Sequence, residues 1–355
     1  MSRSRRRRHA GGMSKLFVLV VLVALAAGAA WLWQRYTGFA DAPLPGIEAG
    51  DTLVVERGDS LAAVLGTLRK QGIEAGHRVE WQALARQLGA ANRLQVGEYA
   101  LEPGTTPRAL LVAMRDGRVV SKRFTIVEGW NIRELRAALR RNTDLQHETD
   151  DMTDAALMTA LGHGGQHPEG RFLPETYQFV RGDSDLDVLR RAHEAMARAL
   201  DAAWAARAPD TVLRSPDEAL VLASIVEKET GVADERPQIA GVFARRLKIG
   251  MKLQTDPTVI YGMGASYAGN IRCADLLADT PYNTYVHAGL PPTPIAMPGA
   301  DALRAAVNPA AGEALFFVAV GDGSGRHVFT RSLSEHQTAV RDYLQRYREQ
   351  RKQAK

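Results

Sequence analysis

The chain has 355 residues, of which 45% are hydrophobic and 24% charged, with a formal net charge of +5 and one cysteine. Six of its 45 basic residues lie in the first 15 positions, and the 39 that remain nearly balance 40 acidic residues, so the charge gives no argument for nucleic-acid binding. A single cysteine excludes an intrachain disulfide, so stability must come from an apolar core, and the chain is long enough for two domains.

The N-terminus has the pattern of a membrane anchor. Residues 1–15 form a basic arm without acidic residues, and residues 16–33 are uncharged for 18 positions, long enough for a transmembrane helix. The positive-inside rule places the arm in the cytoplasm and the rest of the chain outside. A cleaved signal peptide is the alternative, because residues 27–29 (Ala-Gly-Ala) resemble a cleavage site. The uncleaved anchor is favoured because the apolar run continues past that site.

A linker and a small module are expected next. Residues 34–49 are rich in Ala, Pro and Gly and predict a linker, and residues 50–117 alternate strand and helix patterns, as in a small α/β module. Residues 55–61 (Val-Glu-Arg-Gly-Asp-Ser-Leu) resemble the opening of LysM glycan-binding domains. The alternative is a spacer domain that binds nothing.

Residues 118–352 predict a larger mixed α+β domain. The expected elements are a strand over 119–127, helices over 132–141, 186–207 and 238–248, a hairpin over 314–331 and a terminal helix to about residue 351. The segment 142–168 is polar and is predicted to be a loop. Its His163 and His167 lack a further ligand at a convincing spacing, so no metal site is expected.

Two carboxylates end the apolar helix that follows. Residues 215–218 (Ser-Pro-Asp-Glu) form a capped helix start, and Gly231 is placed to stop the helix. Glu229 lies on the stripe of large apolar residues, whereas Glu227 lies on a smaller and more polar face. Desolvation raises a carboxyl pKa, which general acid catalysis near neutral pH requires. The alternative is a helix end whose carboxylates face water or pair with basic neighbours.

Residues 253–299 mix amides, hydroxyls and aromatic rings with proline-stiffened turns. Aromatic faces can stack on sugar rings while the polar groups bond to their substituents, and fixed loops hold a groove open at little entropic cost. This segment therefore predicts a carbohydrate surface, with an ordinary polar loop region as the alternative.

In chain order, residues 224–230 (SIVEKET), 253–262 (LQTDPTVIYG), 282–285 (YNTY) and 289–299 (GLPPTPIAMPG) closely resemble the endolytic murein transglycosylases, the MltG or YceG-like family. Residues 127–129 (VEG) and 172–177 (FLPETY) extend the resemblance over nearly the whole exported chain. Glu175 stands where the family often has Asp, a departure that touches no catalytic role.

The resemblance implies cleavage of glycan strands between N-acetylmuramic acid and N-acetylglucosamine, leaving a 1,6-anhydromuramoyl end. Glu229 is then the catalytic acid and base, and no metal or organic cofactor is implied. The supporting or substrate-binding candidates are Glu227, Thr230, Gln254, Asp256, Thr258, Tyr261, Tyr282, Asn283, Thr284 and Tyr285.

The resemblance and the anchor together imply a single-pass protein of the inner membrane with a periplasmic catalytic domain. Peptidoglycan strands are the expected substrate, membrane-bound peptidoglycan synthases the expected partners, and termination of strand elongation the expected outcome. Two alternatives stay open: a lysozyme-type hydrolase in which Glu229 works with Asp256 and water, and a non-enzymatic scaffold that binds the wall through residues 50–117.

Overall fold

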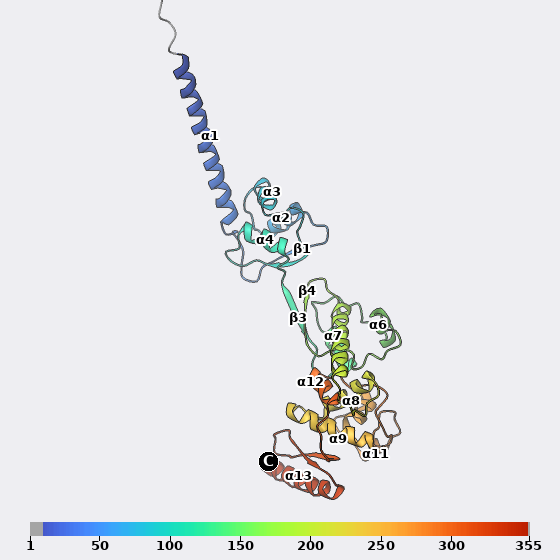
Figure 1. Cartoon of the computed structure of the whole chain (residues 1–355). Helices are drawn as coiled ribbons and strands as arrows, with labels where there is room; N and C mark the ends of the chain where they lie inside the picture. Colours follow the sequence, from blue (N-terminus) through green and yellow to red (C-terminus); the bar gives the residue numbers. More distant parts are fainter. Residues whose placement is uncertain (1–9, 354–355) are drawn as a thin grey trace, which may run out of the picture. The chain divides into compact units, whose positions relative to one another are not determined.

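The structure is a computed structural model that describes residues 10–353 (Figure 1). Most of the expected basic arm, residues 1–9, lies outside the described residues. The chain divides into two compact units, Met1–Lys122 and Arg123–Lys355, and both contain helices and short strands. The fold is therefore mixed α+β.

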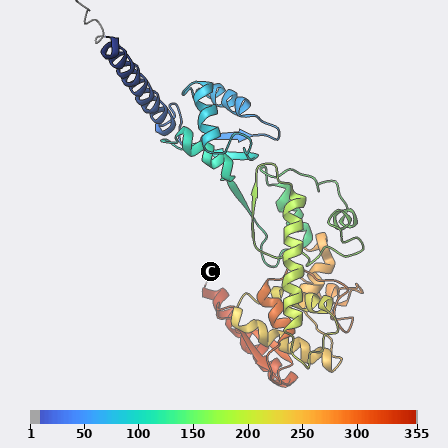
Figure 2. The same cartoon turned by 45° about the horizontal axis from the view of Figure 1, so that its top comes forward.

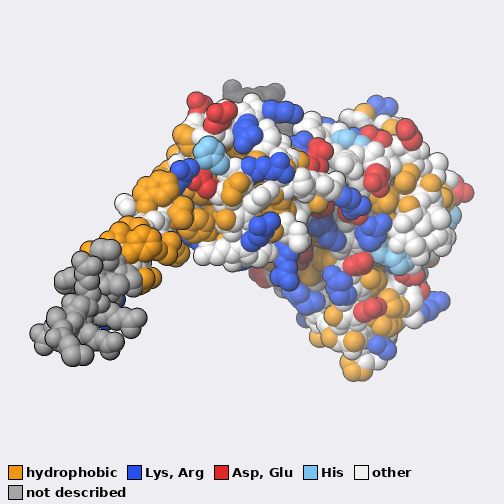
Figure 3. Space-filling model, turned by 90° about the horizontal axis from the view of Figure 1, so that it is seen from above, with side chains coloured by type: hydrophobic (Ala, Val, Ile, Leu, Met, Phe, Trp, Pro, Cys, Tyr) orange, Lys and Arg blue, Asp and Glu red, His pale blue; other side chains and the backbone are white. Residues whose placement is uncertain are grey.

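The first helix is longer than the sequence predicted. α1 (Ala10–Asp41) contains one span, Lys15–Asp41, that is long and apolar enough to cross a membrane, and none of its apolar window is buried. Hydrophobic side chains cover this helix in Figure 3. Its last turns pack on the same unit: Ala40 is fully buried, and Arg35 pairs with Glu80 at 2.9 Å. Residues 34–41, expected as the start of a linker, are thus helical because their inner face joins a core.

The rest of the first unit combines two strands with three helices. β1 (Thr52–Val55) pairs antiparallel with β2 (Gly97–Ala100), and α2 (Leu61–Lys70), α3 (Arg78–Gln87) and α4 (Pro107–Asp116) cover one core. Alternate residues of β1 are buried, as the period of a strand demands. The short strands and helices expected in residues 50–117 are present, while the LysM-like identity of this module and its binding of glycan remain predictions.

The second unit begins with a two-stranded sheet and a long helix. Its elements are β3 (Ser121–Thr125), α5 (Ile132–Arg140), α6 (Asp154–Ala160), β4 (Thr176–Val180) and α7 (Asp185–Ala205). β3 pairs with β4. Helix α6 lies inside the segment expected as a loop, so that prediction was wrong there. A seven-residue helix shows too little periodicity to be recognised, although Leu157 and Met158 bury one face.

Helix α7 runs from the part of this unit that holds β3 and β4 to the part that holds α8 (Figures 1 and 2), and its side chains belong to two apolar clusters. Val188 and Leu189 belong to the cluster around β3, β4 and α5, whereas Met196 and Leu200 belong to a second cluster. That second cluster surrounds α8 (Pro216–Glu229), which packs against α7, α9 (Arg236–Lys248) and α12 (Ala300–Val307). Residues 219–226 of α8 are all buried, so this helix has no exposed face along its centre.

The short helix η1 (Ala233–Glu235) directly precedes α9. Three further short helices follow α9: α10 (Asp256–Met263), η2 (Gly264–Ser266) and α11 (Cys273–Leu277). β5 (Phe316–Ala319) and β6 (His327–Thr330) then form the expected antiparallel hairpin, and α13 (Leu333–Gln353) packs against it. The hairpin and α13 close the side of the unit at which α8 ends.

Candidate active site

Glu229 stands at the exact point where α8 stops. Thr230 leaves the helical conformation with φ −146° and ψ 135°, and its buried hydroxyl accepts a hydrogen bond from the backbone N–H of Val232 at 3.0 Å. The last side chain of α8 therefore projects into a cavity of about 420 Å³, here called the Glu229 cavity. Its wall is formed by Glu229, Arg246, residues 253–256, Tyr285, residues 316–318, Leu333, His336 and Val340.

The surroundings of Glu229 raise the pKa of its carboxyl group, so that a large fraction of it is still protonated at neutral pH. Desolvation raises its pKa to about 7, and the negative charge of Asp256 acts in the same direction. The Thr255 hydroxyl donates a hydrogen bond to Glu229, and this bond, with the more distant charge of Arg246, partly offsets the rise. A carboxyl group of this kind can donate a proton and take one back at the same pH.

Arg246 is the cation of the Glu229 cavity, and no local sequence pattern predicted it. Its Nε donates to the Leu315 carbonyl and its Nη1 to the Leu253 carbonyl, both at 2.7 Å, and its guanidinium lies 5.2 Å from the centre of the Phe316 ring. The guanidinium of Arg246 is therefore stabilised by backbone carbonyls and an aromatic ring rather than by an ion pair with a carboxylate. His336 stacks on Phe316 at 5.2 Å, and desolvation followed by the charge of Arg246 lowers the pKa of His336, which favours a neutral ring.

The turn that carries Gln254 is strained. The backbone φ of Gln254 is +48°, the only positive φ at a non-glycine residue within residues 10–353. The N–H of Gln254 donates a hydrogen bond to the Thr284 carbonyl at 3.1 Å. The Gln254 side chain is exposed and lines the cavity. Beside it, Asp256 accepts a hydrogen bond from the Tyr285 hydroxyl at 2.6 Å. Gln254, Asp256 and Tyr285 therefore line the same cavity as Glu229, while their roles toward a sugar remain predictions.

Three other candidate residues, Thr258, Asn283 and Thr284, are buried. Their hydrogen bonds hold the loops around the cavity together, and they are here called the frame. The hydroxyls of Thr258 and Thr284 lie 2.9 Å apart, and Thr284 also accepts from the Thr255 N–H at 3.1 Å. Asn283 is fully buried; its Nδ2 donates to three backbone carbonyls of residues 275–278, and its Oδ1 accepts from the Tyr285 N–H at 2.9 Å. Asn283, one of the supporting or substrate-binding candidates, therefore uses its bonding capacity inside the protein, which favours a supporting role.

Tyr261 and Tyr282 also lie outside the Glu229 cavity. Their rings pack edge to face at 4.9 Å. The Tyr261 hydroxyl donates to Glu169 at 3.0 Å, and the Tyr282 hydroxyl bonds with that of Thr293 at 2.8 Å. Glu169 is fully buried, also accepts from the Ile132 N–H, and has its pKa raised to about 7 by desolvation. These tyrosines thus tie α10 and the 282–293 loop to the body of the unit.

Glu227 occupies a closed polar site on another side of α8. Its side chain is only 6% exposed, accepts from the Gly299 N–H at 3.0 Å and lies 3.5 Å from Arg236. Arg236 also faces Glu128 at 3.6 Å. The sequence argument placed Glu227 on a more polar face, but both faces of α8 are buried. The two carboxylates differ in their environment: Glu227 lies beside the cation Arg236, whereas Glu229 lies at the wall of an open cavity.

One cluster among the described residues has the composition of a metal site. Ligand atoms of His147, Asp150 and Asp185 lie within 4.8 Å of one another. The buried Asp185 carboxylate already accepts hydrogen bonds from the Glu148 N–H at 3.0 Å and the Thr149 hydroxyl at 2.6 Å. These bonds give Asp185 a structural role, because they hold the loop that contains residues 148 and 149. His163 and His167 do not join this cluster: His163 stacks on His193 at 3.9 Å, and His167 accepts from the Glu169 N–H at 3.1 Å.

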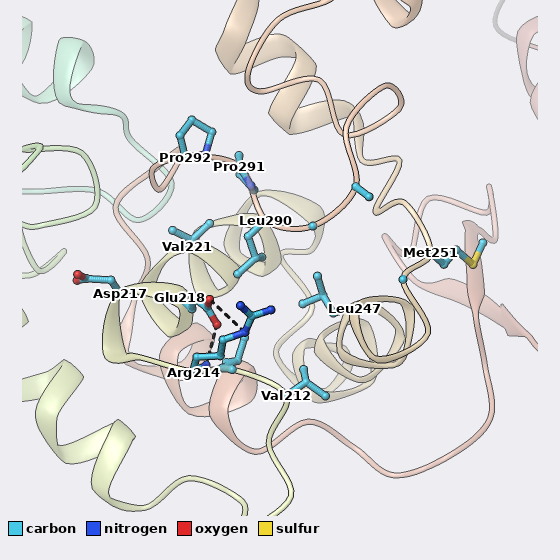
Figure 4. Close-up of a pocket in the computed structure, with 14 residues that line it drawn as sticks. Val212, Arg214, Asp217, Glu218, Val221, Leu247, Met251, Leu290, Pro291 and Pro292 are labelled. Atoms are coloured by element: carbon cyan, nitrogen blue, oxygen red, sulfur yellow. Dashed lines mark hydrogen bonds and ion pairs between the residues drawn. The ribbon is translucent and has the colours of Figure 1, made fainter.

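The proline-rich loop lines a different cavity. Residues 288–292, with Arg214, Asp217, Glu218, Val221 and the end of α9, surround about 480 Å³ (Figure 4). Asp217 and Glu218 lie in the first turn of α8. The predicted carbohydrate surface is therefore divided, because residues 253–256 and Tyr285 line the cavity at the last turn of α8 while residues 289–292 line one at its first.

Comparisons with known proteins show the family of the chain. The family model for the YceG-like family matches residues 53–342. The chain belongs to the YceG-like family. It is 29% identical over 307 residues to an endolytic murein transglycosylase of Bacillus subtilis (strain 168), covering 82% of this chain and 84% of that protein.

Two further relatives support the family membership. An endolytic murein transglycosylase of Streptococcus pneumoniae serotype 2 is 25% identical over 367 residues, covering 93% of this chain and 65% of that protein. The crystal structure of a YceG-like protein from Listeria monocytogenes aligns with a TM-score of 0.50 and 25% identity, over 81% of this chain and 98% of that one. These relatives span both units of the chain.

Proposed function

We propose that this chain is an endolytic murein transglycosylase that cleaves glycan strands with Glu229 as its acid and base. The observation that carries the proposal is a carboxyl group with a pKa of about 7 at the wall of an open cavity, in a chain of the YceG-like family. The relatives that bear the name of this activity add to it.

The reaction needs one carboxyl group. Glu229 donates its proton to the glycosidic oxygen, the bond from that oxygen to C1 of the muramyl sugar breaks, and positive charge develops at C1. The Glu229 carboxylate then takes the proton of the 6-hydroxyl of the same sugar while that oxygen bonds to C1. The products are a 1,6-anhydromuramoyl end and a free 4-hydroxyl on N-acetylglucosamine, and water is not consumed.

The other residues of the Glu229 cavity have supporting roles in this proposal. Asp256, fixed by the Tyr285 hydroxyl, faces the region where positive charge develops. Gln254 is exposed at the rim and offers an amide to a sugar substituent. Indirect roles, in which hydrogen bonds hold the surrounding backbone in place, fall to Glu227, Thr230, Thr258, Asn283 and Thr284. Tyr261 and Tyr282 fix α10 and its neighbouring loop to the rest of the unit.

The membrane and the cell wall complete the proposal. Helix α1 is compatible with a single-pass anchor, which would keep the catalytic unit on the periplasmic side of the inner membrane. There the enzyme would cut nascent strands beside membrane-bound peptidoglycan synthases and end their elongation. The module at 50–117 would raise the local concentration of glycan by binding it.

The test replaces Glu229 with Gln, which keeps the size of the side chain but removes the transferable proton. We expect Glu229→Gln to lower formation of anhydro ends by at least about 100-fold, with folding and strand binding retained. Mass spectrometry of products from purified sacculi measures the effect, and a reducing end in place of the anhydro end would identify a lysozyme-type hydrolase.

Glu227→Gln is the matched control because it makes the same change two residues away, beside Arg236. Its loss of rate should be smaller than that of Glu229→Gln. The choice of Glu229 is wrong if the Glu227 variant is inactive while the Glu229 variant cleaves at the wild-type rate. Normal wall assembly in cells with an inactive Glu229→Gln protein would favour a binding scaffold.

A further inference from the structure

A second concavity adjoins the Glu229 cavity. Lys252, Cys273, Leu276, Leu277, Tyr285 and Val286 surround about 500 Å³, here called the Leu277 pocket. Tyr285 lines both spaces, and the Lys252 ammonium donates to the Tyr285 carbonyl at 3.1 Å. The two spaces are therefore adjacent, and a polymer held with one sugar at Glu229 is long enough to reach this pocket.

The chemistry of the Leu277 pocket differs from that of the Glu229 cavity. Leu276, Leu277 and Val286 give it aliphatic walls, and the Leu277 side chain is 78% exposed. Its lining contains one charge, the ammonium of Lys252, and no carboxylate. The five-residue helix α11, which carries Leu277, is fastened by the buried Asn283 amide, so the exposed leucine stands on a fixed frame.

A sugar ring is a poor match for this lining. Sugar sites use aromatic faces and several converging donors and acceptors, whereas this pocket has one aromatic residue, Tyr285, and otherwise aliphatic carbon, a thiol and one cation. Each muramyl residue of the substrate also carries a short peptide, with small apolar side chains and free carboxylates. Aliphatic walls with a single ammonium suit that peptide, because methyl groups gain from apolar contact and a carboxylate from the cation.

We propose that the Leu277 pocket binds the peptide stem of the muramyl residue near the scissile bond, so that the enzyme prefers strands with stems. This inference rests on the proposed function. Lys252 pairs with a stem carboxylate, and Leu277 covers the apolar part of the stem. Stem-free strands keep their contacts with the Glu229 cavity but lose these two.

The activity test compares the full chain in detergent on intact strands and on strands freed of stems by an amidase. We expect kcat/KM to be at least about fivefold higher on intact strands, through a lower KM, and Leu277→Ser and Lys252→Ala to bring the ratio toward one. Ile249→Ser is the control, because Ile249 is 62% exposed but belongs to none of the cavities described. Equal kcat/KM values for the wild-type protein on the two substrates would overturn the proposal.

A binding test uses Cys273, the single cysteine of the chain, which is exposed and lines the Leu277 pocket. In the Glu229→Gln chain, intact strands should slow maleimide labelling of Cys273 several-fold, and stem-free strands should not. Protection by both kinds of strand alike, or by neither while sedimentation shows binding, contradicts a stem site. Absence of anhydro products from the wild-type protein would instead refute the transglycosylase itself, so the two failures are distinguishable.

Discussion

At the scale of single residues, two carboxylates separated by one lysine have opposite surroundings. Glu227 has Arg236 and the Gly299 N–H as close partners. Glu229 has only the hydroxyl of Thr255 as a close partner and opens onto a cavity. Desolvation raises the pKa of both carboxyl groups, but the Gly299 N–H and Arg236 counteract the rise at Glu227, whereas Glu229 has no close cation and its pKa reaches about 7.

The pKa of Glu229 predicts two opposite shifts in the pH dependence of cleavage. Because the acid must be protonated, kcat/KM should fall as pH rises above about 7. Thr255→Val removes a bond that stabilises the carboxylate, so the pKa rises and the alkaline limb moves to higher pH. Asp256→Asn removes a repelling charge, so the limb moves to lower pH. Rate profiles between pH 5 and 9 would decide, and shifts in the same direction would contradict this account.

At the scale of elements, short helices and turns hold the site together. The N–H of Gln254 and that of Thr255 both bond to Thr284, and Asn283 binds the carbonyls at the end of α11. Helix α8 supplies Glu229 to the cavity. The loop at 279–286 positions the residues opposite Glu229, because Thr284 bonds the backbone of residues 254 and 255 and Tyr285 bonds Asp256. Loss of this loop's order should therefore affect the Glu229 cavity and the Leu277 pocket together.

Asn283 provides the prediction for this frame. Asn283→Ala leaves buried carbonyls without donors and should lower the free energy of unfolding by about 1–3 kcal/mol. Asn283→Asp keeps the acceptor for the Tyr285 N–H but cannot donate to the carbonyls, so it should be destabilised as well. Urea unfolding and hydrogen exchange of residues 273–278 measure both variants. Wild-type stability with a raised KM would instead return Asn283 to a direct role at the sugar.

Glu169 gives a pH-dependent prediction for the link between α5 and α10. Its pKa rises from 4.5 in the unfolded chain to about 7 in the fold, so between these values the folded state holds a proton that the unfolded state has lost. Stability therefore falls as pH rises through this window and is level above it. Relative to Glu169→Gln, the wild-type protein should lose roughly 2–3 kcal/mol between pH 4.5 and 8. Urea unfolding at both values tests it, and a constant difference would contradict the raised pKa.

At the scale of the whole molecule, the chain joins an apolar helix to two folded units. The apolar part of α1 has no buried face, while its last turns enter the core of the first unit through Ala40. A helix that passes from the bilayer directly into a folded module would hold that module close to the membrane surface.

The anchor predicts a definite topology. Alkaline phosphatase fused to the C-terminus should be active, because the basic arm before the apolar run favours an exported C-terminus. The mature protein should begin at its own N-terminus. Enzyme assays and N-terminal sequencing check the two expectations. An inactive fusion would exclude the proposed orientation, and a mature chain starting near Ala30 would show a cleaved signal peptide instead.

The sequence by itself determined the features that depend on neighbouring residues. The apolar run of α1 follows from composition, and the capped start of α8 from Ser215, whose hydroxyl accepts from the Glu218 N–H at 3.2 Å as expected. Hairpin β5–β6 follows from alternation and its glycines. The motif runs pointed to Glu229, and the comparisons confirmed the family that they indicated.

Only the tertiary structure decided what surrounds each carboxylate. The pattern of α8 separated two faces, but packing buried both, because α7, α9 and α12 enclose the helix. Arg246 reaches the Glu229 cavity from another helix, and its role depends on carbonyls of residues 253 and 315 that no local pattern reveals. A pKa depends on desolvation and on charges distant in sequence, so it is a property of the assembled fold.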